Sequence, residues 1–134
     1  ECDWSSDVCS SDLLTGKYLP GKKAPAGSRA TDKKSGAGMI SRWMRDEVLE
    51  AVQKLKPIAE SQGLTMGQLA LAWALQNKNV SSVIMGATKP AQVIENVKAS
   101  GVKLEKDVMK AIDIALGGLP ERDPAKTVAP NPRP

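Results

Sequence analysis

The stretch from Thr65 to Asn77 constrains the fold most, because a helix there would be apolar on nearly every side. A helix of that kind has to be covered from more than one direction. Thr65 and Gln68 have the spacing of a capping box, which predicts where the helix begins. Since the 134 residues include no Phe and only 3% aromatic residues, the core around it must be aliphatic. The apolar residues fall on two faces: Leu69, Ala72 and Trp73 on one, Leu71 and Leu75 on the other.

Helical patterns flank this stretch on both sides. Residues 45–62 carry an apolar stripe, with Pro57 inside it and Gly63 after it. Pro57 predicts a kink or a local break, because proline lacks the backbone N–H that an interior helical residue donates. Gly63 is typical of the residue that ends a helix. Two further helices are predicted over residues 90–100 and 105–116. The stripe consists of Val48, Leu49, Val52, Leu55 and Ala59.

A short β-prone run, Val80–Met85, separates the first helices from the later ones. Its last part, Val83–Met85, is apolar without alternation, which is typical of a strand covered on both faces. The order of helix, helix, strand, turn and helix predicts an α/β protein built from βα repeats. In such folds ligands bind at the carboxyl ends of the strands, where the chain turns into the next helix.

The turn from Gly86 to Pro90 is therefore a candidate binding site. Gly86 lets a ligand approach the backbone closely, and the free N–H groups at the start of the next helix attract an anion such as phosphate. Thr88 would add a hydroxyl donor and Lys89 a positive charge. A solvated helix face, with Thr88 as a simple cap, is the alternative that these residues leave open. Three polar residues at i, i+3 and i+4 spacing then share one helix face: Gln92, Glu95 and Asn96.

Residues 14–41 are rich in Gly, Pro, Lys and Arg and predict a long basic loop. Loops longer than about 12–15 residues are usually either functional or disordered. A solvated linker and a part of a binding site are both compatible with this composition.

The first residues differ in character from the rest. Asp3–Asp12 is the translation of GAC TGG AGT TCA GAC GTG TGC TCT TCC GAT, a string found in a widely used sequencing adapter. The CT that follows in the adapter would open the codon of Leu13. We expect residues 1–12 to be a translated adapter, a non-native leader, rather than a native Ser/Asp-rich segment. Removing its four acidic residues would raise the net charge from +4 to +8, and both cysteines would go with it.

Four segments, in this order along the chain, resemble the C-terminal part of the NADP-dependent aldo-keto reductases, especially the bacterial branch similar to potassium-channel β subunits. The resemblance implies a (β/α)8 TIM barrel, an α/β fold. Residues 13–118 would then supply about strands 7 and 8 with their helices, and residues 119–134 a Pro-rich tail. Residues 83–85 would be the eighth strand and 105–116 the extra C-terminal helix. The segments are LLTGKY (13–18), SRA (28–30), LTMGQLALAW (64–73) and VIMGATKPAQVIENVKA (83–99).

The resemblance also implies roles for individual residues around an NADP cofactor. Lys17 would contact the pyrophosphate, and Arg29 would cover the adenosine end from the basic loop. Gly86 and Thr88, with Lys89 nearby, would hold the 2′-phosphate at the start of the helix. The remaining cofactor positions are Gln92, which matches a cofactor-contacting residue, and Glu95 and Asn96, which would hydrogen-bond the adenine.

In the family, the catalytic Asp, Tyr, Lys and His or Asn lie in the first half of the barrel. This chain has no His, and its only Tyr, Tyr18, stands in the GKY segment. We therefore expect no catalytic residue and no metal ligand set here, and no activity from this chain alone. The intact parent would reduce an aldehyde or ketone with NADPH, a hydride transfer in which a Tyr protonates the carbonyl oxygen.

Two other functions stay open. One is a non-catalytic regulatory barrel similar to a channel β subunit. The other is a small basic helical binder of nucleic acid, although the helices lack a basic recognition face and interleaved aromatic residues.

The sequence also bears on location and stability. The chain has no apolar run of the ~18 residues that a membrane span needs, and a cysteine-free remainder without a signal favours the cytoplasm. A piece of a closed barrel should hold loosely packed helices without forming a stable monomeric globule, because its strands lack their neighbours.

Overall fold

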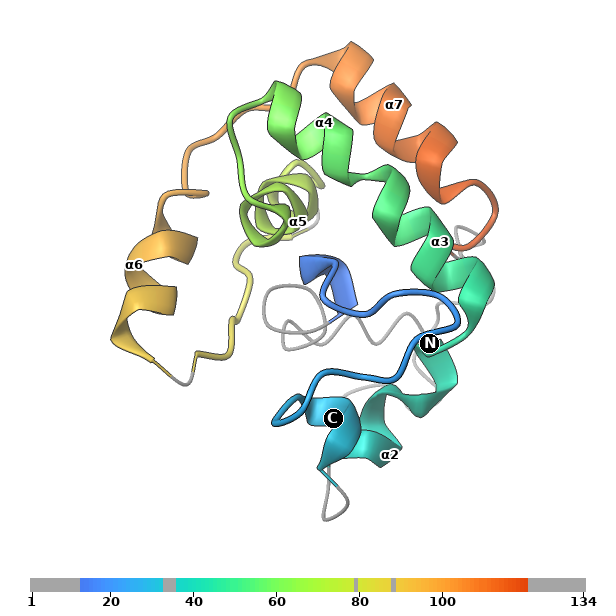
Figure 1. Cartoon of the computed structure of the whole chain (residues 1–134). Helices are drawn as coiled ribbons and strands as arrows, with labels where there is room; N and C mark the ends of the chain where they lie inside the picture. The colour runs from blue at the N-terminus through green and yellow to red at the C-terminus, as the bar shows by residue number, and fades with distance from the viewer. Residues whose placement is uncertain (1–12, 33–35, 79, 88, 121–134) are drawn as a thin grey trace, which may run out of the picture.

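The computed structural model describes residues 13–32, 36–78, 80–87 and 89–120. The predicted leader, Thr88 and residues 121–134 of the predicted tail lie outside the described residues. The four predicted helical regions are confirmed, and Figure 1 shows them arranged around a central helix. The elements are the 3-10 helices η1 (Leu13–Thr15), η2 (Arg29–Thr31) and η3 (Ser41–Trp43), and the α-helices α2 (Gly36–Ile40), α3 (Asp46–Lys54), α4 (Lys56–Ser61), α5 (Met66–Leu75), α6 (Pro90–Val97) and α7 (Lys106–Leu116).

The helical region predicted over residues 45–62 forms two helices, α3 and α4, which meet at Leu55. Pro57 lies in the first turn of α4, where a missing N–H leaves no intrahelical hydrogen bond unmade. The predicted break at the proline is therefore confirmed. Asp46 and Glu47 occupy the first turn of α3, where carboxylates interact favourably with the helix dipole.

α5 is the central helix and is seen end-on in Figure 1. Its capping box is confirmed: Thr65 Oγ1 accepts from the Gln68 N–H at 3.2 Å, and Gln68 Oε1 accepts from the Thr65 N–H at 3.0 Å. The helices η1, α4 and α6 pack against it. The two predicted apolar faces are both covered, since Leu69 and Ala72 from one face and Leu71 from the other are buried.

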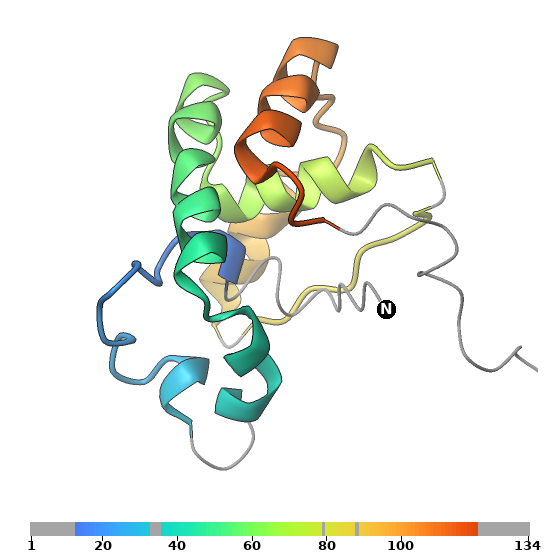
Figure 2. The same ribbon diagram turned by 90° about the vertical axis from the view of Figure 1, so that its right-hand side faces the viewer.

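The hydrophobic core lies between α5 and the helices α3, α4 and α7. Figure 2 shows α3, α4 and α7 side by side, with α5 running across them. The fully buried side chains of the core are aliphatic as predicted, apart from Tyr18, and Trp43 and Trp73 pack against the core while partly buried. Full burial of one such side chain contributes about 1.5–3 kcal/mol relative to leaving it exposed. The largest fully buried side chains are Tyr18, Ile40, Leu69, Ile112 and Val52.

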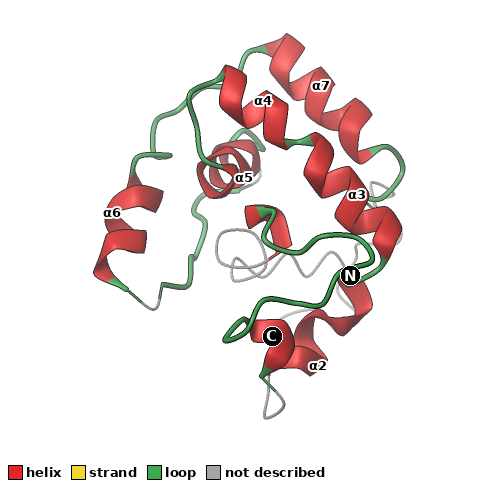
Figure 3. Ribbon diagram, viewed as in Figure 1, coloured by secondary structure: helices red, strands yellow, loops and turns green. Residues whose placement is uncertain are grey.

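The strand predicted at Val83–Met85 does not form. Residues 80–87 are irregular, and Figure 3 shows no strand anywhere in the described part of the chain. A β-strand has to exchange backbone hydrogen bonds with a neighbouring strand, and the described residues offer none. Ile84, which should be covered on both sides, is 78% exposed. The prediction of a covered strand is therefore wrong for this chain by itself.

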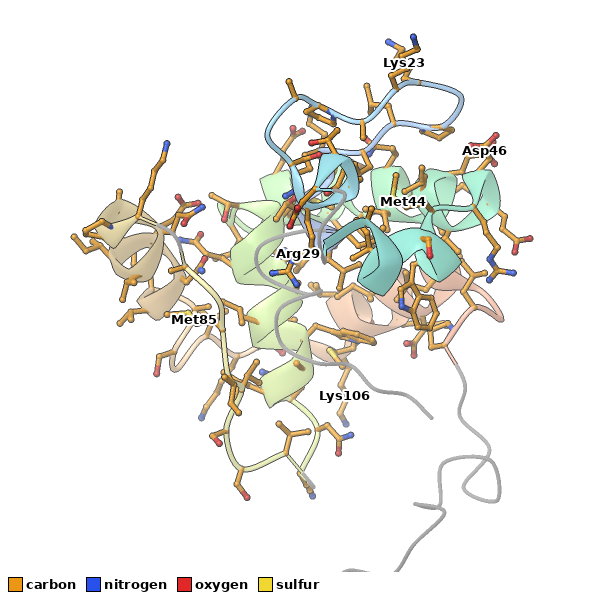
Figure 4. The ribbon with its side chains drawn as sticks, turned by 90° about the horizontal axis from the view of Figure 1, so that it is seen from below. Lys23, Arg29, Met44, Asp46, Met85 and Lys106 are labelled. Atoms are coloured by element: carbon orange, nitrogen blue, oxygen red, sulfur yellow. The ribbon has the colours of Figure 1, made fainter. Side chains whose placement is uncertain are left out.

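The basic loop predicted over residues 14–41 is more ordered than the sequence indicated. It contains η1, η2 and α2, and α2 packs against η2. Tyr18 and Ile40 are fully buried, and this removal of apolar surface from water favours the packing of the described parts of the loop. Lys22 and Lys23 remain exposed, and Figure 4 shows Lys23 pointing away from the rest of the molecule.

Candidate functional site

The turn that leads into α6 forms the first part of the predicted site. Lys89 is the N-cap residue in an extended conformation, and Pro90 opens the helix as predicted. Gln92 Oε1 accepts a hydrogen bond from the Lys89 N–H at 3.1 Å. Gly86 is half-buried just before this turn, and Thr88 lies outside the described residues. A helix start of this kind presents backbone N–H groups that attract an anion.

α6 has an unusual orientation for a helix at the surface. Its Asn96 is buried, at 8% exposure, whereas Ile94 is 66% exposed. An ordinary surface helix buries its apolar stripe and exposes its polar face. The burial of Asn96 does not match the solvated helix face that the sequence left open, whereas the exposure of Glu95 is compatible with it. The exposed apolar residues of this helix are Val93, Ile94 and Val97.

The three polar residues predicted on one face of α6 differ in exposure. Asn96 is buried, Gln92 is half-buried and the side chain of Glu95 is exposed. Gln68 Nε2, on α5, donates a hydrogen bond to the carbonyl oxygen of Glu95 at 2.8 Å. This bond attaches the turn that carries Glu95 and Asn96 to the central helix.

The segment after η1 forms the second part of the predicted site. Gly16 has a φ of +73°, a left-handed conformation that strains any other residue, and it turns the chain out of η1. Gln53 Nε2, on α3, donates to the carbonyl oxygens of Gly16 at 3.0 Å and Tyr18 at 3.1 Å. Lys17, between them, is half-buried. Its Nζ lies 5.2 Å from the centre of the Tyr18 ring, within cation–π range.

Arg29 begins η2 in closely packed surroundings. The Tyr18 hydroxyl accepts a hydrogen bond from the Ala30 N–H at 3.3 Å. A Cβ at Gly36 would lie 2.5 Å from Arg29 Cγ and 2.7 Å from the Arg29 carbonyl oxygen, so α2 reaches η2 only because residue 36 is glycine. Ser28 Oγ is buried and has no hydrogen-bond partner among the described residues. A buried hydroxyl in that state gains free energy from any acceptor that reaches it.

The predicted residues thus form two groups, one in the loop that lies below α5 in Figure 1 and one at and before α6, to the left of α5. We call the predicted residues Lys17 and Arg29, together with Ser28, which was not predicted, the loop group. The hydrogen bonds given above connect Gly16 and Tyr18, on either side of Lys17, to α3, and Glu95 to α5, rather than one group to the other. The turn group consists of Gly86, Gln92, Glu95 and Asn96.

Sequence reasoning missed the side chains that hold these groups in place. Gln53 carries no sequence signal, because its two hydrogen-bond partners lie 37 and 35 residues away. Gln68 was recognised only as a capping residue, and its spacing gives no hint of the bond to Glu95. Tyr18 was noted only as part of the GKY segment, away from the position of the catalytic acid, although its hydroxyl and ring both have structural contacts.

Other kinds of site find little support. Within the described ranges, no group of three or more His, Cys, Asp or Glu side chains could hold a metal ion. Those ranges also contain no helix long and apolar enough to cross a membrane. A small crevice in the core has an apolar lining, without the donors and acceptors that a nucleotide requires. It is lined by Leu14, Leu55, Met66, Leu69, Ala70, Trp73, Ile112 and Leu116.

Comparison with known proteins identifies related chains. Over 114 residues the chain is 42% identical to a rice protein (Oryza sativa subsp. japonica) named "Probable voltage-gated potassium channel subunit beta", covering 84% of this chain and 34% of that protein. Over 113 residues it is 44% identical to a Schizosaccharomyces pombe protein also named as such a subunit, covering 82% of this chain and 32% of that protein.

A solved structure is similar as well. The glycerol dehydrogenase of Gluconobacter oxydans matches with a TM-score of 0.59 and 25% identity, over 84% of this chain and 33% of that enzyme. The chain therefore spans about a third of the length of these relatives.

The aldo/keto reductase family model matches residues 6–116. The match begins inside the predicted leader, whose origin stays a prediction. The family model matches most of the chain, and the relatives and the structural neighbour agree with this match. The chain therefore belongs to the aldo/keto reductase family.

Proposed function

We propose that this chain is the C-terminal part of an aldo-keto reductase barrel and carries the adenosine and 2′-phosphate half of an NADP site. The observation that carries the proposal is the burial of the Asn96 amide on α6, one turn from the half-buried Gln92. A helix that turns amide side chains inward beside its own anion-attracting start is suited to hold a nucleotide.

The residues present fit such a cofactor. Its phosphates are anionic, and the loop group offers two cations, Lys17 and Arg29, together with the buried hydroxyl of Ser28. The guanidinium of Arg29 suits a phosphate because it can donate two parallel hydrogen bonds. When bound, the cofactor would supply hydride to an aldehyde or ketone carbonyl carbon in the parent protein. The turn group, Gly86, Gln92, Glu95 and Asn96 with Thr88, would hold the 2′-phosphate and the adenine.

The same proposal accounts for the segment that forms no strand. Residues 83–85 would become the eighth strand of the barrel once neighbouring strands are present. Residues 13–18 would follow the seventh strand, and α7 would be the extra C-terminal helix. The continuously apolar sequence of residues 83–85 supports this assignment, since strands of a parallel barrel are covered on both faces.

The chemistry of the reaction would lie in the preceding part of the parent, so we expect no carbonyl reductase activity from this chain alone. Tyr18 is 1% exposed and packed in the core, which leaves it out of reach of a substrate. The purified chain mixed with NADPH and an aromatic aldehyde should show no loss of NADPH absorbance beyond the blank. Turnover that survives Tyr18→Phe would contradict this assignment.

The cofactor assignment is tested in the full-length parent, obtained by recovering the reading frame upstream of residue 13. Lys17→Ala, Arg29→Ala and Thr88→Ala should each weaken NADPH binding by about 1–3 kcal/mol, as expected for the loss of one charge-assisted hydrogen bond. Hydride transfer from the bound cofactor should slow less. The Arg29 and Thr88 variants should affect NADPH more than NADH, and equal losses for the two cofactors would count against the assignment.

A regulatory barrel is the second candidate, because the two relatives described above are named as potassium channel β subunits. The two candidates differ in turnover. A parent that binds NADPH and a channel protein but reduces no aldehyde or ketone would favour the regulatory function. Location in the cytoplasm is compatible with both candidates.

A further inference from the structure

We propose that Gln53 and Tyr18 are positioning residues that hold Lys17 and Arg29 for the cofactor. The proposal rests on the proposed NADP site and adds two residues to it. Lys17 and Arg29 come from two separate segments of the chain. The contacts of Gln53 and Tyr18 tie both segments to the rigid helix α3.

Gln53 holds the backbone on both sides of Lys17. A glutamine amide nitrogen has two N–H donors, and here one nitrogen donates to the carbonyl oxygens of Gly16 and Tyr18, at 3.0 and 3.1 Å. These two carbonyls flank Lys17 directly in the sequence. The backbone of Lys17 is therefore fixed to α3 at the preceding and the following residue.

Tyr18 extends the connection to the segment that carries Arg29. Its ring is fully buried, so the position of its hydroxyl is set by core packing. That hydroxyl accepts from the N–H of Ala30, the residue after Arg29, at 3.3 Å. The same ring lies under the Lys17 ammonium group at 5.2 Å. One tyrosine therefore contacts both parts of the loop that supply a cation.

Such a connection matters because lysine and arginine side chains are long and flexible. Ordering a flexible basic loop at the moment of binding would subtract from affinity, whereas a loop already fixed avoids that cost. Gln53 should act through Lys17, which is assigned to the pyrophosphate present in both NADPH and NADH. The Tyr18 hydroxyl should act through Arg29, at the adenosine end where only NADPH carries a 2′-phosphate.

The test uses the full-length parent and the dissociation constants of NADPH and NADH. Gln53→Met keeps the length of the side chain but removes both donors. It should weaken the two cofactors alike, by about three- to tenfold, as for one or two neutral hydrogen bonds. Tyr18→Phe keeps the ring and removes only the hydroxyl. It should weaken NADPH by about threefold and NADH by less. The matched control is Gln62→Met, at an exposed glutamine after α4, which should change neither constant.

A double variant separates positioning from a general loss of structure. If Gln53 acts through Lys17, then Gln53→Met in a Lys17→Ala background should add less than about a twofold further loss. A full additional loss in that background would assign Gln53 a merely structural role. If Gln53→Met does not fold, Gln53→Leu provides the same test, because its uncharged side chain also donates no hydrogen bond.

The outcomes separate the two proposals. If Lys17→Ala and Arg29→Ala leave NADPH binding unchanged, the proposed NADP site is wrong. If those two variants weaken binding while Gln53→Met and Tyr18→Phe do not, the NADP site stands and the positioning role is overturned. An equal loss of NADPH and NADH affinity in Tyr18→Phe would also overturn the role assigned to its hydroxyl.

Discussion

α5 and α6 are neighbouring helices in which comparable apolar residues have opposite environments. In α5, Leu69 is buried at 2% exposure, and η1, α4 and α6 cover the helix. In α6, Ile94 and Val97 are exposed while Asn96 is buried. The irregular segment before α6 continues this exposed region with Ile84.

The difference shows that an apolar pattern specifies burial only where a partner is present. Removing apolar surface from water is favourable wherever it occurs, so exposed Ile and Val side chains indicate missing cover rather than a different local preference. α3, α4, α5 and α7 cover one another within the described residues. Residues 80–97 carry a pattern suited to a larger protein, in agreement with a chain that spans about a third of its relatives.

The largest expected effect is on cooperativity. The isolated chain should give a helical circular dichroism spectrum but no sharp thermal transition, because Ile84, Ile94 and Val97 lack cover and the proposed barrel is open. The full-length parent should melt in one cooperative step. A sharp transition from a monomer of the isolated chain, at low protein concentration, would show that α3, α4, α5 and α7 are sufficient for a stable fold.

A pair of alanine substitutions compares the two regions directly. Leu69→Ala removes a buried side chain and should lower the free energy of unfolding of the parent by about 2–5 kcal/mol. In the isolated chain it should reduce helix content. Ile84→Ala should leave the isolated chain unchanged, because Ile84 is already exposed. In the parent, where Ile84 would belong to the proposed eighth strand, the same substitution should lower the free energy of unfolding by a similar amount, about 2–5 kcal/mol. Urea unfolding of the parent measures both values, and a silent Ile84→Ala there would contradict the strand assignment.

Gln68 connects the two regions, and its loss should have an intermediate effect. Thr65→Ala removes the side-chain cap of α5 and should cost about 0.5–2 kcal/mol. Gln68→Ala removes its part of the cap and also the bond to the Glu95 carbonyl oxygen, so it should cost about 1 kcal/mol more than Thr65→Ala. Amide hydrogen exchange in the parent should then show faster exchange in α6 for Gln68→Ala than for Thr65→Ala. Equal exchange in the two variants would indicate that α6 is held by other contacts.

The smallest expected effect is at the exposed face of α6. Ile94→Ser should change the helix content of the isolated chain very little, because Ile and Ser have similar helix propensities and the position is exposed. The expected change in free energy is less than about 0.5 kcal/mol. Val52→Ser, at a buried position of α3, is the matched comparison and should reduce helix content clearly. A large loss in Ile94→Ser would mean that the outer face of α6 has a partner within this chain.

The sequence by itself determined the local structure. The capping residues, the proline at the start of α4 and the 3.6-residue periodicity placed the helical regions, because these signals act between residues a few positions apart. The motifs were also sufficient to identify the family, because a family is recognised by the order of short sequence segments. The sequence did not reveal that η2 and α2 form within the basic loop, because composition does not show which side chains reach the core.

Only the tertiary structure decided which side chains hold the candidate site. The bonds from Gln53 to Gly16 and Tyr18, and from Gln68 to Glu95, join residues 27 to 37 positions apart. The tertiary structure also decided that residues 83–85 are not a strand here. A helix satisfies its backbone hydrogen bonds within its own segment, whereas a strand depends on a neighbour that its own sequence cannot supply. For that reason the helices were predictable from this chain and the strand was not.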